Sequence, residues 1–395
     1  MKGQLEMWSN MTNRRGFAVL FLALSLAVFT SRGWSNELRT SMMGNCSIAL
    51  YDEDNQINPY DFGHNPAYLL NDFELEWMRF VFGLEEESGK LKRPYDPLLV
   101  NNLYIGFNGI RKLGDRHVTK GSFTYTRLWQ REISNSLEID QYNDPFYLAD
   151  ETTGDFEYYG PSTQVDYSLR LKPNLYIGLG FDYDISTGLK QNYTKPEIVH
   201  TYFKGNIGLI YEARKSWLIG LVARPVRLQN RTKFRRTDEG FDNVIYRWYG
   251  DGIYDIRAVS DYTVRELLYG VEVGLQNFIM TDRFKLGAIM SYSLNQNKLR
   301  YHATKRVLQG FWQSTVYDLD LRARYTPPGI PLVIGISGRF MNDDGWAKRP
   351  DFNDVLLYEN PVELISVGGG LSYLIDAADL LVSAEYLMNM YDVEA

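Results

Sequence analysis

Residue types that build catalytic and metal centres are scarce in this sequence. Its 395 residues include one cysteine, Cys46, and four histidines. A single cysteine excludes an internal disulfide framework and a zinc site built from several thiolates. The histidines lie at His64, His117, His200 and His302, without the HxxxH or HExxH spacing of zinc-binding helices. Because no Gly-x-Ser-x-Gly motif precedes a helix either, we expect no metal, no cofactor and no catalytic residue.

Long apolar runs are almost absent as well. Residues 17 to 29, FAVLFLALSLAVF, form the only one, whereas a polytopic helical membrane protein needs several runs of about 20 apolar residues. The net charge of −7 argues against nucleic acid as a partner. Arg14 and Arg15 precede the apolar run, and Gly33 and Ser35 follow it. This order predicts a cleaved signal peptide over residues 1–35, and therefore export.

Beyond the signal, hydrophobicity alternates with a period of two. Apolar side chains occupy odd positions from Val165 to Leu171, while the even positions between them carry polar and charged groups. The pattern resumes after Lys172-Pro173-Asn174, which predicts a β-hairpin. Five further hairpins are predicted, with strands at 101–113 and 118–130, 202–213 and 217–229, 264–278 and 284–299, 312–325 and 332–342, and 362–374 and 380–390. A first strand is expected at 73–84.

The connections are short within hairpins and long between them, notably from Glu132 to Pro161 and from Asn230 to Thr263. Long strands with this loop asymmetry are typical of a transmembrane antiparallel outer-membrane β-barrel. A soluble β-sandwich, the alternative, predicts shorter strands and no asymmetry. The expected fold class is therefore all-β, with about 14 strands.

Thirteen of these strands are visible in the sequence, and an even barrel requires one more. Either the barrel region, residues 73–395, lacks its last strand, or one strand is assigned wrongly. We favour the missing strand.

In a barrel, the charged face of each strand has only the lumen to face, because an arginine in the middle of the lipid costs about 2 to 4 kcal/mol. This argument predicts a set of lumen-lining residues: Asp166, Arg170, Asp182, Asp318, Asp320, Arg322 and Arg324.

The segment before the barrel, residues 36–72, carries a family resemblance. Met43-Gly44-Asn45 is followed by small and aliphatic residues, an acidic pair, and then Asn65, Pro66 and Ala67. This arrangement resembles the N-terminal signature of long-chain fatty-acid transporter (FadL-like) proteins, especially their PorV-like branch. The resemblance implies 14 strands, a hatch that folds into the lumen with Asn65-Pro66-Ala67 as its motif, and passage of hydrophobic small molecules through the barrel wall. A disordered periplasmic arm is the alternative for this segment.

Charge is uneven in the long loops. The connection from Glu132 to Pro161 contains eight acidic residues, Asp150 among them, and no Lys or Arg, so we expect it to stand in water. A basic cluster lies at the outward end of another strand and includes Arg224. Within it, the expected contacts to phosphates of outer-membrane lipid and lipopolysaccharide are Arg231, Lys233, Arg235 and Arg236. Two solvated loops without a ligand are the alternative.

Three functions fit these observations. The first is a channel in the bacterial outer membrane that takes up hydrophobic small molecules. The second is an accessory barrel that binds exported proteins at the cell surface, as the PorV-like resemblance implies. The third is an outer-membrane hydrolase with Ser and His on adjacent strands. The first is favoured. An apolar pocket beside an opening in the wall would separate it from the second, and a Ser-His-acid contact would identify the third.

Overall fold

The structure is a computed structural model. It describes residues 57–72, 75–89, 96–133, 145–191, 194–234, 244–249, 254–258, 262–302, 306–350, 353–375 and 378–391. The predicted signal peptide, residues 1–35, and the first part of the predicted hatch, residues 36–56, lie outside the described residues. From here on, the hatch means residues 57–72.

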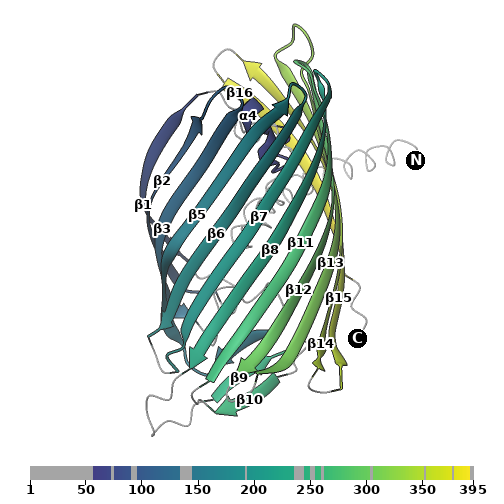
Figure 1. The fold of residues 1–395 in the computed structure, drawn as a ribbon. Helices are drawn as coiled ribbons and strands as arrows, with labels where there is room; N and C mark the ends of the chain where they lie inside the picture. Colours follow the sequence, from purple (N-terminus) through teal and green to yellow (C-terminus); the bar gives the residue numbers. More distant parts are fainter. Residues whose placement is uncertain are drawn as a thin grey trace, which may run out of the picture.

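Thirteen strands form one antiparallel sheet that curls into a barrel (Figure 1). The strands follow one another in chain order, with β1 and β16 at the two edges of the sheet. They are β1 (Trp77–Ser88), β2 (Leu99–Lys112), β3 (His117–Ile133), β5 (Gly154–Lys172), β6 (Leu175–Lys190), β7 (Glu197–Arg214), β8 (Trp217–Phe234), β11 (Tyr262–Met280), β12 (Phe284–His302), β13 (Arg306–Tyr325), β14 (Leu332–Arg349), β15 (Val355–Ile375) and β16 (Ala378–Tyr391). The predicted barrel is confirmed, and every predicted hairpin is present.

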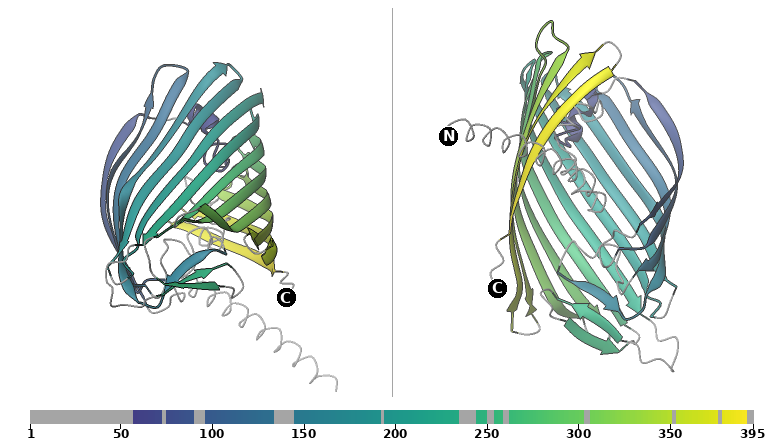
Figure 2. Two further views of the ribbon diagram at one scale, coloured as in Figure 1. Left: turned by 60° about the horizontal axis from the view of Figure 1, so that its bottom comes forward. Right: turned by 180° about the vertical axis from the view of Figure 1, so that it is seen from behind.

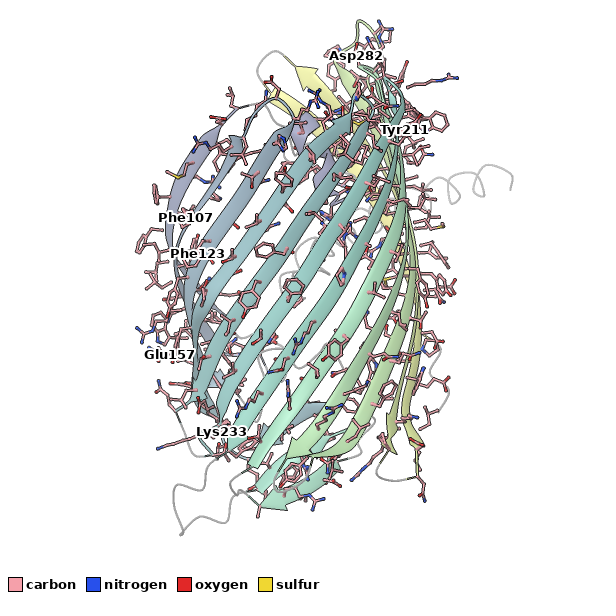
Figure 3. The ribbon with its side chains drawn as sticks, viewed as in Figure 1. Phe107, Phe123, Glu157, Tyr211, Lys233 and Asp282 are labelled. Atoms are coloured by element: carbon pink, nitrogen blue, oxygen red, sulfur yellow. The ribbon has the colours of Figure 1, made fainter. Side chains whose placement is uncertain are left out.

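Side chains on each strand alternate between lipid and lumen. On β11, Tyr269, Val271, Val273 and Leu275 are each 42–51% exposed, whereas Phe278 on the opposite face is fully buried. Exposed apolar side chains also occur on β1 to β3, on β5 to β8 and on β12 to β15. Figure 3 shows this arrangement on the left-hand wall, where Phe107 and Phe123 lie at mid-height. The outer faces of twelve of the thirteen wall strands thus carry exposed apolar side chains, which is the pattern of a transmembrane barrel surrounded by lipid.

The hatch lies inside this barrel, near the end with the short turns (Figures 1 and 2). It contains a 3-10 turn, η1 (Pro66–Tyr68), and one helical turn, α4 (Leu69–Asp72). These two elements contact β3, β5, β6 and β7. None of the helices among the described residues is long and apolar enough to cross a membrane.

A second, three-stranded sheet lies across the opposite mouth of the barrel (Figure 2). Its strands are β4 (Tyr147–Asp150), β9 (Val244–Trp248) and β10 (Tyr254–Ala258), in the order β10-β9-β4. We call this sheet the cap. These segments were predicted to be parts of long connections, so the cap is a correction to that prediction. Its inner face is apolar and packs on wall side chains: Phe146, Leu148, Ile245 and Tyr249 contact a cluster that includes Phe156, Phe234 and Val264.

Buried polar contacts fix the cap to the wall. Lys190 Nζ lies 2.7 Å from both carboxylate oxygens of Asp150, and both side chains are at most 1% exposed. Thr194 Oγ1 donates to the same carboxylate over 2.8 Å. The expectation that the acidic connection stands in water is therefore wrong for Asp150. A carboxylate can be buried here because a lysine and a hydroxyl group satisfy its oxygens.

Two further contacts hold the other cap strands. Arg247 on β9 donates from Nη1 to Gln309 Oε1 on β13 over 2.6 Å. Asp255 on β10 accepts two hydrogen bonds from Arg349 on β14, at 3.2 and 2.9 Å. Each cap strand is thus joined to a wall strand that is distant in sequence.

The buried ion pair gives a test of the cap. Lys190→Met leaves the Asp150 carboxylate buried without its cation, which costs about 3–5 kcal/mol. We expect hydrogen–deuterium exchange of the β4 amides to accelerate accordingly. The double variant Lys190→Met/Asp150→Leu should recover most of the protection, and Lys215→Met, in an exposed turn, should change nothing. Equal exchange in the Lys190→Met variant and the wild type would contradict the assignment of the cap anchor.

Candidate functional site

The hatch is bound to the wall through Asn65, which is fully buried. Its Nδ2 donates to Gln276 Oε1 over 3.0 Å and to the backbone oxygens of Leu221, over 3.2 Å, and Leu209, over 3.4 Å. Its Oδ1 accepts from Ala67 N over 3.1 Å and caps the η1 turn. Asn65 therefore both starts the turn and joins it to strands β7, β8 and β11. Pro66 and Ala67 are buried in that turn.

Glycines on the lumen side of the wall make room for this turn. A Cβ atom at Gly178 on β6 would lie 2.1 Å from Ala67 N, and one at Gly208 on β7 would lie 2.0 Å from Asn65 Oδ1. No side chain fits at these distances, so the wall backbone meets the hatch backbone at Gly178 and the side-chain amide of Asn65 at Gly208. Ser168 on β5 adds a hydrogen bond of 2.8 Å from Oγ to Ala67 O.

The first part of the hatch is a compact loop that presents Tyr60 to the wall. Asn58 Oδ1 accepts from the backbone N–H groups of Tyr60 and Asp61, both over 2.8 Å. Tyr60 Oη then donates to Asp166 Oδ2 over 2.9 Å. Burial, together with the Asp166 carboxylate, raises the pKa of Tyr60 far above its usual value. The phenol therefore stays protonated and remains a donor.

Phe62 is inserted between two wall side chains. Its ring meets Phe278 edge to face, with centroids 6.1 Å apart, and the Arg322 guanidinium lies 4.2 Å from its centroid. Arg224 on β8 donates to Gly63 O over 2.7 Å and also pairs with Glu272. The hatch is thus held by apolar packing and by hydrogen bonds from charged side chains.

A cavity of about 330 Å³ lies on the side of the hatch that faces the cap. Hatch residues Tyr60 and His64 form one side of it. The wall contributes charged and amide side chains from four consecutive strands: Gln164, Asp166, Asp182, Lys204, Asn206 and Arg224. We call this cavity the lumenal pocket. Because both signs of charge line it, it is suited to a polar solute that carries charges of both signs.

His64 contributes little positive charge to this pocket. Its ring has exposed surface, but that surface lies inside the barrel. Enclosure in the barrel, with Arg224, Lys204 and Arg322 nearby, lowers the pKa of His64 to about 4. The ring is therefore neutral at neutral pH, and Lys204 and Arg224 are the cations of the pocket.

The structure places the predicted lumen-lining residues as follows. Asp166 and Asp182 line the lumenal pocket, and Arg322 contacts the hatch. Asp320 pairs with Arg322 over 3.3 Å. Of the others, Asp318 pairs with Arg339 over 2.8 Å, Arg170 donates to Asp115 O in a turn over 3.1 Å, and Arg324 lies opposite Lys285 on β12.

The predicted lipid-phosphate residues are only partly described. Arg231 is exposed on β8, and Lys233 is half-buried opposite Glu197 on β7. Arg235 and Arg236 lie outside the described residues. Arg224, which the sequence analysis grouped with this basic cluster, is 6% exposed and faces the hatch. That grouping was wrong for Arg224.

Two further wall contacts of the hatch were missed by the sequence analysis. Gln276 is fully buried, holds Asn65, and donates from Nε2 to Gly63 O over 2.5 Å. Arg224 holds the same hatch segment. The available signal was the alternation along the strand, because each occupies an even position beside an apolar odd position, Ala223 for Arg224 and Leu275 for Gln276. Within the described part of the chain, no group of three His, Cys, Asp or Glu side chains could hold a metal ion.

Comparison with known proteins defines the family. A family of unknown function, DUF6850, matches residues 66–360 of the chain. The chain belongs to DUF6850. The match begins at Pro66 in the hatch and ends within β15, so this DUF6850 domain includes the η1 turn and most of the barrel. No curated protein matches the chain in sequence.

Solved structures similar to this DUF6850 barrel share little sequence with it. The ferric preacinetobactin receptor BauA from Acinetobacter baumannii has 10% identity and a TM-score of 0.42, over 79% of this chain and 57% of BauA. The toluene transporter TodX from Pseudomonas putida has 8% identity and a TM-score of 0.35, over 83% of this chain and 90% of TodX. The protease OmpT from Escherichia coli has 12% identity and a TM-score of 0.25, over 73% and 96%. These values carry no conclusion about function.

The glycine contacts give a test of hatch docking. A methyl group at Gly178 collides with Ala67 N, so Gly178→Ala should displace the hatch at a cost of about 1–3 kcal/mol. The reporter is a cysteine introduced by Leu69→Cys, because Leu69 is 1% exposed and becomes accessible only when the hatch moves. The substitution Cys46→Ser removes the native cysteine. We expect maleimide labelling of this cysteine to rise in the Gly178→Ala variant.

The matched control for that test is Gly121→Ala. A Cβ at this position on β3 has its nearest neighbour at 3.7 Å. Labelling should stay at the wild-type level in this control. Equal labelling in the Gly178→Ala and Gly121→Ala variants would contradict the proposed fit between hatch and wall.

Proposed function

We propose that the protein is a bacterial outer-membrane channel whose hatch gates the passage of a small polar solute. The observation that carries this proposal is the lumenal pocket, a charged cavity of about 330 Å³ that the hatch closes on one side. That volume is at the lower end of the range for small-molecule sites. The chemistry offered by the pocket is binding and release, and we propose that the protein is not an enzyme.

The lining of the pocket favours a polar solute over a hydrophobic one. Asp166, Asp182, Lys204 and Arg224 all line it. An apolar ligand placed against these groups would displace their water without offering new hydrogen bonds, which costs free energy. A solute with an amino group and a carboxylate matches both kinds of partner. The hydrophobic cargo implied by the FadL-like resemblance has no support in this pocket and stays a prediction.

The contacts that hold the hatch to the wall support its proposed role as a gate. Its polar contacts to the wall are hydrogen bonds, for example from Arg224 to Gly63 O and from Tyr60 to Asp166. Water can replace such bonds when the hatch moves, so the net contribution of each to stability is only about 1.5–3 kcal/mol, the range for hydrogen bonds that involve a charged group. The hatch can therefore leave the wall without unfolding the barrel.

A second candidate function is an accessory barrel that binds exported proteins. The observation favouring it is a row of aromatic rings on the cap. The rings of Tyr147 and Trp248 stack at 5.3 Å and 8°, and Tyr254 lies 4.8 Å from Trp248. Tyr254 and its neighbour Ile256 are 45% and 54% exposed. Exposed aromatic and aliphatic side chains are frequent in protein interfaces.

Planar-bilayer recordings test the channel. We expect a low conductance for the wild type and a higher one for Gly178→Ala, because the variant displaces the hatch. In the Gly178→Ala background, Lys204→Gln should shift the reversal potential in a salt gradient toward cation selectivity, and Asp182→Asn toward anion selectivity. Asp182 lies directly opposite Lys204, so these two changes alter one site in opposite senses.

Lys215→Gln, in the turn outside the lumen, is the control for charge and should leave selectivity unchanged. Absence of solute flux through Gly178→Ala in liposome swelling, with its hatch shown to be displaced by labelling, would overturn the channel proposal. That result would favour the accessory barrel.

A further inference from the structure

Three arginines stand side by side across three strands of the outer wall. In the registers of the sheet, Arg231 on β8 lies directly opposite Arg265 on β11, and Arg265 lies directly opposite Arg300 on β12. We call these three residues the arginine row. Like charges directly opposite each other destabilise a sheet.

The arginine row faces outward. On β8, the neighbours of Arg231 are Thr232, which is 3% exposed and inward, and the outward Lys233. On β11, Glu266 is buried and accepts from the lumenal Asn230, so the adjacent Arg265 points to the other face. Arg300 follows Leu299, which is buried in the cluster under the cap.

The row lies at the height of lipid headgroups. Trp217 begins β8 at the short-turn end and is 37% exposed, as expected at a membrane interface. Arg231 follows fourteen residues later, which is roughly 35 Å along the barrel axis for a strand tilted as in such barrels. A hydrocarbon core of about 30 Å ends just before that point. Figure 3 shows Lys233, two residues further on, near the end opposite Tyr211.

Among the described residues, no carboxylate forms a salt bridge with Arg231, Arg265 or Arg300. Arg265 donates to Gln229 Oε1, but its Nε is buried and has no hydrogen-bond partner. Glu197 on β7 lies directly opposite Lys233, and Val199 lies directly opposite Arg231. In the part of the chain that the structure describes, the three guanidinium groups of the arginine row therefore have no carboxylate paired with them.

We propose that the arginine row binds the phosphate groups of lipid A, the phosphorylated glycolipid anchor of lipopolysaccharide, in the outer leaflet. Guanidinium groups bind phosphate with two parallel hydrogen bonds, and a phosphate between two arginines removes their mutual repulsion. Further along β11 towards the middle of the barrel, Tyr269 and Val271 are 45% and 42% exposed and offer an apolar surface to acyl chains. This inference rests on the proposed outer-membrane location but not on solute passage.

The test compares thermal unfolding with and without lipid A. The protein is folded in a neutral detergent, and bisphosphorylated lipid A is added. In detergent alone, Arg265→Gln should be at least as stable as the wild type, because one repulsive charge is gone. With lipid A present, the wild type should be the more stable of the two proteins. The Arg265→Gln variant should bind lipid A at least about tenfold more weakly than the wild type. Arg265→Lys should bind lipid A with an affinity between those of the wild type and Arg265→Gln, because lysine keeps the positive charge but lacks the paired N–H donors of the guanidinium group.

Controls separate this site from a general effect of charge. Arg214→Gln removes an exposed arginine at the opposite end of the barrel and should bind lipid A like the wild type. Dephosphorylated lipid A, which keeps the acyl chains but has no phosphate, should stabilise wild type and Arg265→Gln equally. Equal binding of lipid A by wild type and Arg265→Gln, or loss of stability of Arg265→Gln in detergent alone, would overturn the proposal. Channel recordings are unaffected by either result, so the two proposals fail separately.

Discussion

The apolar outer face of the sheet determines where charged side chains can lie in the part of the wall that crosses the hydrocarbon layer. Since residues alternate strictly along a strand, an outward row such as Val271, Val273 and Leu275 forces the intervening residues into the lumen. The lumen is therefore polar and must be filled or hydrated. The hatch at one end and the cap at the other satisfy many of these inward groups, Arg224 and Gln276 for the hatch and Lys190 for the cap.

The strands and their two faces could be predicted from the sequence because period-two alternation is a local property. Asp166 and Arg322 were assigned to the lumen from parity alone, and both contact the hatch. The same alternation of odd and even positions would also have assigned Arg224 to a different face of the strand from Arg227 and Arg231. These residues are close in sequence, but Arg224 occupies an even position of β8 and faces inward. Grouping charges by proximity along the chain hid that difference.

The cap could not be predicted, because its strands are defined by distant partners. β4 and β10 have four and five residues, and each is stabilised by contacts with segments far away in sequence. Asp150 and Lys190 are 40 residues apart, and Asp255 and Arg349 are 94 apart. The pairing of an acid in one connection with a base on a wall strand leaves no local pattern. The glycines that admit the hatch, such as Gly178, are equally ambiguous, since glycine in a strand also occurs at bends.

The hatch and the cap differ in how firmly they are held, which supports the proposal that the hatch is the gate. The hatch buries three large apolar side chains, Ile57, Phe62 and Leu69, each worth about 1.5–3 kcal/mol.

The cap buries Phe146, Leu148, Ile245 and Tyr249 against the wall, and in addition places the Lys190–Asp150 pair out of contact with water. Opening the cap would separate that buried pair in a poorly hydrated site, at a cost of several kcal/mol. Opening the hatch would break hydrogen bonds such as the one from Arg224 to Gly63 O, while Arg224 keeps Glu272 as its partner in the wall. This difference supports the proposal that the hatch moves before the cap does, and the lumenal pocket lies directly beside the hatch.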